Sequence, residues 1–600
     1  GGLTWIKARN FGSSNHALFD TARGGGKYLQ SNQTLGQETP GSAPLTFNSN
    51  GFTINTQADS WNGTYYNNEY VSWTWRKAKK FFDIVTYTGN GSARTISHNL
   101  GSVPGMIIIK STTSQEDWVV YHRSLGGGYY SKLQDTAQFL GVNTSVFNGT
   151  DATDSVFSVG NSSKSNGSGQ TYVAYVFAHN NNDGGFGPNA DQDIIKCGSY
   201  TGNDNTSSIN LGFEAQWLLI KNASSAANWE LFDVMRGMAV GTNGVAATLK
   251  TNQNNAEYVY PSNAGIYPTA NGFDIDSSQS NFNGAGYTYI YMAIRRGSLT
   301  SPTLGTQVFA ADLGDTSSVP QFVSNFPVDM AILRDINGSD SAQVSSRLTG
   351  TAYMTANSNG SENNNSYYEW DFHTGYFSTA LNTDYFAWMW KRAPGYFDVV
   401  CYDGSNSNST INHNLGVAPE MIWVKRRDVS SGHWRVFIPS LSGILKLNGT
   451  DALDTSNAKY YFGDNNNIIA PTATQFTVTP QTGNVNTNSS RYVAYLFATL
   501  AGVSKVGSYT GNGSAQNIDC GFSNGARFVL IKNSSSTSNW VLVDSVRGLV
   551  SGNDKWLALE STASQYTYDL IDPYSSGFAL AAGETNVNTT GSTYIFYAIA

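Results

Sequence analysis

Charge is scarce in this sequence. Asp, Glu, Lys and Arg together make up 13% of the 600 residues, against about 25% in an average soluble protein. The formal net charge of -8 is mild for this length, and no cluster of Lys and Arg is long enough to follow a phosphate backbone. We therefore expect no nucleic acid partner, and we expect neutral polar side chains to keep the chain soluble.

Long apolar runs and cysteines are also rare. Runs such as YVAYVFA at Tyr172–Ala178 are far shorter than the roughly 20 residues that a membrane helix requires, so we expect no membrane insertion. The chain has three cysteines, Cys197, Cys401 and Cys520. We interpret them as buried side chains of strands rather than as disulfide partners or metal ligands.

Familiar catalytic and metal-binding patterns are missing. There is no G-x-S-x-G, no H-E-x-x-H and no P-loop. The Asp and Asn side chains of Gly149–Asp154 and Gly449–Thr455 offer oxygen atoms to calcium, but the EF-hand pattern is absent. We predict no catalytic residue, no metal site, no cofactor and no enzyme activity. A carboxylate pair for glycoside hydrolysis stays open, because its two members need not be close in the chain.

The dominant positive feature is an internal repeat. The segment Phe81–Lys110, FFDIVTYTGNGSARTISHNLGSVPGMIIIK, returns at Tyr396–Lys425 as YFDVVCYDGSNSNSTINHNLGVAPEMIWVK. Three classes of one unit follow each other, and the trio then recurs roughly 305 to 320 residues later. The first class is marked by SWTWRKA and AWMWKRA, the second by the segment above, and the third by GSYTGN at Gly198 and at Gly507.

Each unit has the pattern of β-strands. Phe82, Ile84 and Thr86 alternate with polar or outward-facing neighbours, which is typical of a strand with one buried face. Tyr87–Gly91 has turn chemistry, and no long segment has a helical apolar period. The sequence therefore predicts an all-β fold, a tandem array of about six antiparallel β-sandwich domains arranged as two sets of three.

The repeat also predicts domain boundaries. The first copy lacks the opening strand of the other units, so we expect a window cut from a longer polypeptide, with a strand supplied from elsewhere as the alternative. The short joints predict a stiff, rod-like array. The expected domains are 1–79 (domain 1, incomplete at its start), 80–180 (domain 2), 194–297 (domain 3), 298–394 (domain 4), 395–501 (domain 5) and 502–600 (domain 6), with a linker at 181–193.

Two recurring sets of polar residues have a structural interpretation. A Lys, Trp, Asp and Arg set marks the third class: Lys221, Trp229, Asp233 and Arg236 match Lys532, Trp540, Asp544 and Arg547. A charged ligand pocket is one reading. We favour an ion pair that holds neighbouring loops, with the indole in the core. His98 and His413 precede Asn-Leu-Gly in the same turn, where we expect hydrogen-bonded turn residues rather than bases or ligands.

Tyrosines flanked by Asn, Ser and Gly are the better candidates for binding. Their rings offer a flat apolar face with a polar tip, which suits sugar or protein surfaces. Packing between units is the alternative role. The predicted binding residues are Tyr65, Tyr66, Tyr129, Tyr130, Tyr367, Tyr368, Tyr460 and Tyr461.

The second-class segment, followed by EDWVVYHRSLG at Glu116–Gly126 and closed by TYVAYVFA, resembles repeat modules of tail-fibre and other virion structural proteins of tailed bacteriophages, marine ones especially. The resemblance covers the second class well, the third moderately and the first mainly through SWTWRKA and AWMWKRA. It implies a protein of the virion surface, outside the cell. It carries over no catalytic residue.

Together these features predict a virion appendage, a tail fibre or adhesin that binds host surface glycan or protein through its loops. We expect a homo-oligomer that contacts other virion proteins. One alternative is a purely structural protein, such as a capsid decoration or fibre shaft, with no receptor contact. A polysaccharide depolymerase is the second alternative.

Overall fold

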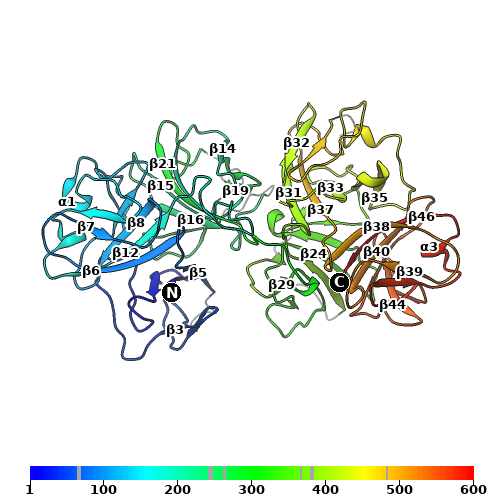
Figure 1. The fold of residues 1–600 in the computed structure, drawn as a ribbon, viewed down its shortest axis with the longest axis horizontal. Helices are drawn as coiled ribbons and strands as arrows, with labels where there is room; N and C mark the ends of the chain where they lie inside the picture. Colours follow the sequence, from blue (N-terminus) through cyan, green and yellow to red (C-terminus); the bar gives the residue numbers. More distant parts are fainter. Residues whose placement is uncertain are drawn as a thin grey trace. The chain divides into compact units, whose positions relative to one another are not determined.

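The computed structural model describes residues 1–63, 69–240, 247–260, 265–276, 278–364, 368–378, 384–480 and 484–600. Strands account for 41% of the chain and helices for 4% (Figure 1), and the strand pairs among the described residues are antiparallel. The chain forms two compact units. The first comprises 1–234 and 243–296, and the second comprises 235–242 and 297–600. The predicted all-β fold with two sets of β-sandwich domains is confirmed.

Each set of strands within a unit forms one larger and one smaller sheet. In the first unit the elements are β1 (Gly2–Ala8), β2 (Ala17–Asp20), β3 (Leu45–Phe47), β4 (Phe52–Ile54), β5 (Tyr70–Arg76), β6 (Phe82–Thr88), β7 (Arg94–Ser97), β8 (Pro104–Ser111), β9 (Val119–His122), β10 (Ser131–Lys132), α1 (Thr144–Phe147), β11 (Val156–Val159), α2 (Ser163–Asn166), β12 (Thr171–Ala178), β13 (Ile195–Thr201), β14 (Ser207–Asn210), β15 (Ala215–Asn222), β16 (Trp229–Asp233), β17 (Ala247–Lys250), β18 (Tyr258–Val259), β19 (Gly265–Thr269), β20 (Gly272–Asp276) and β21 (Thr288–Arg295).

The second unit repeats this plan. Its elements are η2 (Gly305–Gln307), β22 (Phe309–Leu313), β23 (Phe322–Val323), β24 (Met330–Asp335), β25 (Gln343–Ser346), η3 (Arg347–Thr349), β26 (Ala352–Thr355), β27 (Asn363–Asn364), β28 (Tyr368–Glu369), β29 (Gly375–Ser378), β30 (Tyr385–Trp390), β31 (Phe397–Asp403), β32 (Ser409–Asn412), β33 (Met421–Arg426), β34 (Arg435–Ile438), η4 (Pro439–Leu441), β35 (Gly443–Lys446), η5 (Ala458–Tyr460), β36 (Gln475–Val478), β37 (Arg491–Phe497), β38 (Ser504–Thr510), β39 (Gln516–Asp519), β40 (Phe528–Asn533), β41 (Trp540–Asp544), β42 (Asp554–Ala558), β43 (Tyr566–Tyr568), β44 (Ile571–Tyr574), β45 (Gly577–Leu580), α3 (Thr585–Asn588) and β46 (Thr593–Ile599).

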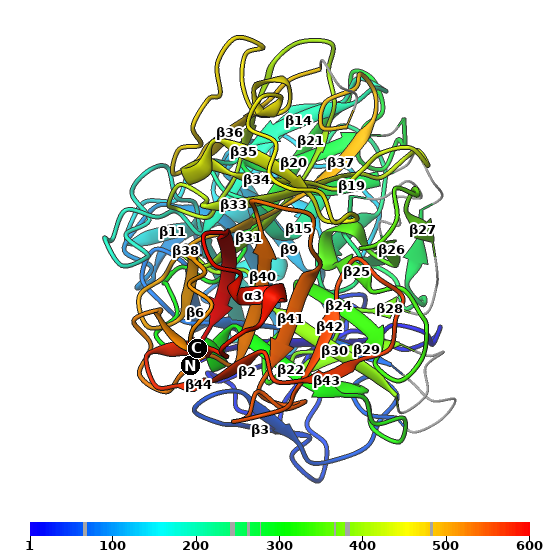
Figure 2. The same ribbon diagram turned by 90° about the vertical axis from the view of Figure 1, so that its right-hand side faces the viewer.

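The strand order of the larger sheet is the same in domains 2 to 6. The closing strand of each domain lies between the opening strand and the next long strand, as in β13-β21-β15 and β38-β46-β40. Figure 2 shows how β40, β41, β42 and β43 then follow one another across the sheet of domain 6. These closing strands are buried along almost their whole length, because they have a strand on both sides and other layers on both faces.

Domain 1 departs from this order. Its larger sheet is β2-β1-β5 and its smaller sheet is β3-β4. The closing strand β5 therefore forms the edge of its sheet in the described part of the chain, where domains 2 to 6 place an opening strand.

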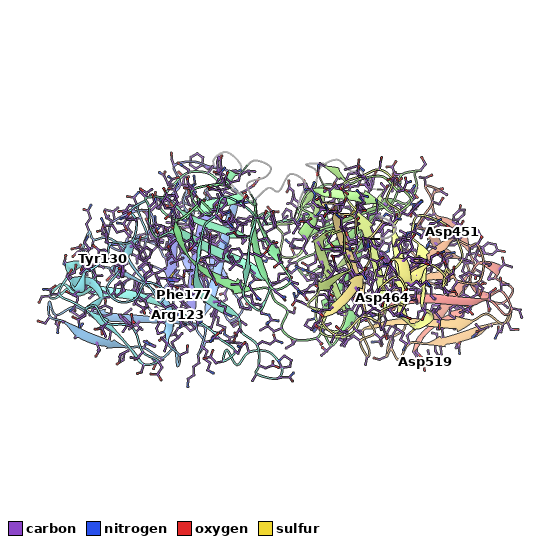
Figure 3. The ribbon with its side chains drawn as sticks, turned by 90° about the horizontal axis from the view of Figure 1, so that it is seen from above. Arg123, Tyr130, Phe177, Asp451, Asp464 and Asp519 are labelled. Carbon is purple, nitrogen blue, oxygen red and sulfur yellow. The ribbon has the colours of Figure 1, made fainter. Side chains whose placement is uncertain are left out.

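The three domains of each unit pack around one shared core. In the first unit this core includes Trp75 of domain 1, Phe177 of domain 2 and Trp217 of domain 3. The centroid of the Trp75 ring lies 6.1 Å from that of Phe177 and 5.5 Å from that of Trp217. Figure 3 labels Phe177 among these side chains. In the second unit Trp390, Phe497 and Phe528 belong to one such core.

The last domain of each unit also contacts the first one. Trp73 Nε1 of domain 1 donates to Asp233 Oδ2 of domain 3 at 3.0 Å, and Trp388 Nε1 of domain 4 donates to Asp544 Oδ2 of domain 6 at 3.0 Å. The rod-like order predicted from the short joints is therefore wrong within each unit. A shared apolar core removes more surface from water than two contacts in a row would, so the three domains close on one another.

Candidate functional site

The predicted binding tyrosines do not form one exposed group. Tyr129 is 41% exposed and Tyr460 is half-buried, whereas the expected exposure is wrong for Tyr130, Tyr368 and Tyr461, which are 5%, 3% and 8% exposed. Tyr65, Tyr66 and Tyr367 lie outside the described residues.

Local packing explains the buried members. Tyr368 stacks on Tyr376 with a centroid separation of 5.8 Å, and the guanidinium of Arg435 lies 4.5 Å from the ring centroid of Tyr461. Successive side chains of an extended backbone point to opposite faces. In a Tyr-Tyr pair such as Tyr129-Tyr130, one ring therefore faces solvent while the other packs against the domain.

A second group of tyrosines, which was not predicted from the sequence, is exposed. Tyr258 is 48% exposed on β18, and Tyr566 and Tyr568 are 42% and 54% exposed on β43. Both strands form the edge of a six-stranded sheet at matched places of domains 3 and 6. The sequence feature that could have identified these tyrosines is the recurrence of E-Y-V-Y at 257–260 as Q-Y-T-Y at 565–568.

Packing beneath each edge fixes these rings. The ring of Tyr566 stacks on Trp556 of β42, with centroids 4.4 Å apart and an interplanar angle of 22°. The ammonium of Lys250 lies 5.1 Å from the ring centroid of Tyr258, and Tyr260 meets Tyr258 edge-on at 4.9 Å. We call Tyr258, Tyr566 and Tyr568 the edge tyrosines.

Neighbouring domains also hold both edge strands. The amide of Glu257 donates to the carbonyl of Arg9 at 2.6 Å, and Glu257 Oε2 pairs with Arg9 Nε at 3.2 Å. In the second unit the amide of Gln565 donates to the carbonyl of Ile336 at 2.9 Å. A backbone hydrogen bond therefore attaches the start of each edge strand to the first-class domain of its unit.

Buried carboxylates lie under the edges but have no exposed oxygen to offer. Glu230 Oε1 accepts from the Tyr260 hydroxyl at 3.0 Å and Oε2 accepts from the Thr248 hydroxyl at 2.8 Å, and burial raises the pKa of Glu230. Burial also raises the pKa of Asp554 to about 6, and its carboxylate accepts from the amides of Leu570 and Ile571. These bonds satisfy buried polar groups and organise the edge.

The recurring tryptophans lie at domain junctions, not only in a core. Trp229 Nε1 donates to the carbonyl of Lys132 at 2.9 Å, and Trp540 Nε1 donates to that of Lys446 at 3.0 Å. The second-class domains use matching residues, since Trp118 reaches Gln30 and Trp434 reaches Thr355, both at 2.9 Å. Each indole therefore fills apolar space and also ties its domain to the preceding one.

A side chain other than tryptophan closes the third junction of each unit, which lies between its first and last domains. His16 Nε2 lies 3.1 Å from the carbonyl oxygen of Lys250. In the second unit Arg334 Nη1 donates to the carbonyl of Ala558 at 2.9 Å, and Nη2 donates to that of Ala563. The three junctions of a unit thus share one feature, a side-chain nitrogen that meets a backbone carbonyl of the neighbouring domain.

The recurring lysines cross the same junctions. Lys221 Nζ donates to the carbonyls of Thr136 and Ala227 at 3.0 and 2.6 Å, and Lys532 Nζ donates to those of Thr450 and Ser538 at 3.0 and 2.8 Å. Burial lowers the pKa of both ammonium groups to about 8. The matched lysines of the other domains are Lys7, Lys110 and Lys425, with the same lowering of the pKa to about 8. Lys110 and Lys425 also donate to the preceding domain, whereas Lys7 Nζ donates to the carbonyl of Ala8 in its own domain at 2.7 Å.

The Asp and Arg members of the set are buried as well. Arg547 Nε pairs with Asp544 Oδ2 at 2.5 Å, and the same carboxylate oxygen accepts from Trp388 of domain 4. Asp233 and Arg236 are 4% and 5% exposed. The Asp544 carboxylate is thus shared between Arg547 of its own domain and Trp388 of domain 4.

The histidine turns and the cysteines offer no reactive group. Nδ1 of His98 accepts from the amide of Leu100 at 3.2 Å, and Nδ1 of His413 accepts from that of Leu415 at 3.3 Å. Burial lowers the pKa of both imidazoles. All three cysteines are free thiols, and burial raises the pKa of Cys401 to about 11.

The described ranges show neither a candidate metal site nor a candidate membrane span. Within them, no group of three or more His, Cys, Asp and Glu side chains is placed to hold a metal ion. No described helix has the length and apolar character to cross a bilayer.

A cavity of about 250 Å³ lies beside the linker, with Asp191, Asp193 and Arg295 in its wall. Asp193 already accepts from the amides of Asn182 and Gly184, at 2.7 and 3.0 Å. Its carboxylate therefore serves the linker's own backbone.

Comparison with known proteins identifies a family. A family described as a domain of unknown function (DUF7483) matches residues 1–296 and 336–600, and the two matches correspond to the two repeated sets. No curated protein matches the chain. Because the family covers most of the sequence, the chain belongs to this DUF7483 family.

Proposed function

We propose that this protein is a bacteriophage virion appendage, a tail fibre or adhesin, and that its edge tyrosines bind glycan or protein on the host surface. The observation that carries the proposal is the matched exposure of Tyr258 on β18 and Tyr566 on β43, with Tyr568 exposed beside Tyr566. The low charge of the chain and its resemblance to phage tail-fibre modules support the same function.

The chemistry of the edge suits a neutral sugar. A tyrosine ring stacks on the apolar face of a pyranose while its hydroxyl remains in water to bond sugar hydroxyls. Tyr566 is already held against the buried ring of Trp556, so binding costs little side-chain entropy. Two such edges in one chain would raise avidity toward a repetitive surface.

The test compares variants on a glycan array and in adsorption to host cells. The double variant Tyr566→Ser and Tyr568→Ser should lose most binding, and adding Tyr258→Ser should remove the remainder. Tyr129→Ser is the matched control, because Tyr129 is also exposed but lies in domain 2. Unchanged adsorption by the triple variant, with the protein mapped to an internal shell of the particle, would contradict the proposal.

A purely structural role on the virion is the second candidate. It is favoured by the burial of Tyr130, Tyr368 and Tyr461, since these aromatic side chains pack instead of facing a receptor. Under this role the edge variants leave adsorption unchanged, and labelled antibody locates the protein on a shaft or capsid surface. The same pair of measurements therefore separates the two candidates.

A further inference from the structure

The edge strands of domains 3 and 6 present matched tyrosines beside different neighbours. Tyr258 pairs with Thr248 of β17, and Tyr566 pairs with Trp556 of β42 at the matched position. In domain 6 the exposed ring therefore rests on a second aromatic ring, with centroids 4.4 Å apart. In domain 3 the Thr248 hydroxyl instead donates to Glu230 Oε2 at 2.8 Å. The two edges thus share an exposed tyrosine and differ in the groups around it.

A lysine lies beside the tyrosine ring in domain 3. Lys250 is the last residue of β17, on the same face of the strand as the residue that pairs with Tyr258. Its ammonium lies 5.1 Å from the ring centroid of Tyr258, which is within the range of cation–π attraction. The matched position of domain 6 is occupied by Ala558. The ammonium is therefore a feature that domain 6 lacks at this position.

The Lys250 ammonium is available to a ligand. Lys250 is half-buried, and within the described ranges its Nζ has neither a hydrogen bond nor an ion pair. Glu230 lies opposite Lys250 in the strand pairing, but its two oxygens accept from neighbouring hydroxyl groups. Glu257, which precedes the exposed tyrosine, pairs with Arg9. The edge of domain 3 therefore has a cation that can meet an anionic group next to an exposed aromatic ring.

The edge of domain 6 has carboxylates in its surroundings instead. Asp569 directly follows Tyr568 and is half-buried. Burial raises the pKa of Glu584, and the charge of Asp569 adds to this rise. Lys555 is exposed on β42 but pairs with Thr567, so its side chain points to the other face of the sheet from the two tyrosines. An anionic ligand on the Tyr568 side would therefore meet carboxylates and no facing cation among the described residues.

We propose that the edge of domain 3 binds an acidic sugar, whereas the edge of domain 6 binds a neutral one. The assignment rests on the proposed function, in which the edge tyrosines bind glycan. The Tyr258 ring stacks on the apolar face of the sugar, and the Lys250 ammonium pairs with its carboxylate or sulfate group. A charge-assisted hydrogen bond is roughly twice as strong as a neutral one, so the ammonium selects the charged sugar.

A glycan array separates the two edges in the full 600-residue chain. The array prints carboxylated and sulfated oligosaccharides, each beside its carboxyl-reduced or desulfated form. We expect the unmodified chain to bind acidic and neutral members. Lys250→Gln should weaken binding to the acidic members at least tenfold and leave the neutral members unchanged, and Lys250→Arg should keep most of the acidic binding. The double variant Tyr566→Ser and Tyr568→Ser should show the converse pattern.

Lys555→Gln is the matched control, because Lys555 is an exposed lysine on the other face of the domain 6 sheet. It should change neither class of binding. Salt at about 1 M should weaken the acidic binding alone, since exposed charges are screened.

Three results would overturn the inference: unchanged acidic binding by Lys250→Gln, an equal loss in Lys555→Gln, or binding of neutral members alone by the unmodified chain. The proposed function survives each of them if the tyrosine variants lose binding. An unmodified chain that binds no member of the array contradicts both.

Discussion

The two units close two of their three junctions with the same kind of side chain and the third with a different one. The first unit uses Trp118, Trp229 and His16, and the second uses Trp434, Trp540 and Arg334. Four junctions thus have an indole, one an imidazole and one a guanidinium. Each one brings a nitrogen to a backbone carbonyl of the neighbouring domain. The contact that repeats is therefore the one between a backbone carbonyl and a side-chain nitrogen, while the side chain that supplies the nitrogen differs at the third junction.

The three kinds of side chain close their junctions in different ways. An indole closes a junction by filling volume and by donating one hydrogen bond. Arg334 closes its junction with two donated bonds to Ala558 and Ala563, and in that domain it also takes the place of the recurring lysine. His16 accepts the Trp5 indole N–H on Nδ1 at 2.9 Å and reaches Lys250 with its other nitrogen.

The largest effect should come from the tryptophans. Trp229→Ala and Trp540→Ala each remove a fully buried side chain and leave a cavity, which costs about 3–5 kcal/mol. Urea unfolding of the full chain measures the loss. Trp→Phe at the same places keeps most of the volume but leaves the carbonyl without its partner, so it should cost about 1–3 kcal/mol. Equal losses for Ala and Phe would show that volume contributes little.

The next effect should come from Arg334, whose two donated bonds cross the junction between domains 4 and 6. Arg334→Met keeps an apolar stem but leaves the carbonyls of Ala558 and Ala563 without their donor. Each unpaired carbonyl should lower the free energy of unfolding by about 1–3 kcal/mol. Arg334→Lys should recover part of the loss, because the other five domains place a lysine here. If the Arg334→Met and Arg334→Lys variants were equally stable in urea unfolding, hydrogen bonds from this side chain would not hold the junction.

Rising pH should stabilise both units, and the first unit more. The five matched lysines have a folded pKa of about 8, below the usual 10.4 of an unfolded lysine. Between these values the unfolded chain binds more protons, so stability increases with pH. We expect a gain of about 1 kcal/mol per lysine for each pH unit in this range. The first unit contains Lys7, Lys110 and Lys221, and the second contains only Lys425 and Lys532.

Scanning calorimetry between pH 7.5 and 9.5 tests this pH dependence. Lys221→Met should reduce the slope of the transition temperature with pH in the first unit, and Lys532→Met should do so in the second. Above pH 10 the trend should reverse. Burial raises the pKa of Tyr87 and Tyr200 well above the usual value, so unfolded tyrosines lose their protons first. A falling transition temperature between pH 8 and 9.5 would contradict the lysine assignment.

The sequence predicted the strands, the repeats and the two sets, because alternation and turn residues act locally. It did not predict the closed packing of three domains, since a junction carbonyl such as that of Lys132 leaves no mark on residue type. For the same reason the sequence predicts the indole of Trp229 in a core but does not predict its hydrogen bond to the neighbouring domain. Exposure of Tyr129 and burial of Tyr130 depend on which face of an extended segment packs, and loop sequence alone does not decide that.

The smallest effect should come from His16, and it sharpens the comparison between the units. His16→Ala leaves Trp5 Nε1 and the Lys250 carbonyl without partners, at about 1–2 kcal/mol together. The same junction keeps the Arg9 and Glu257 ion pair at 3.2 Å and the hydrogen bond from Ser31 to the Thr251 carbonyl at 2.7 Å. These contacts limit the loss, which urea unfolding should place below that of Arg334→Met. An equal or larger loss would mean that the imidazole, and not these neighbouring contacts, closes the first unit.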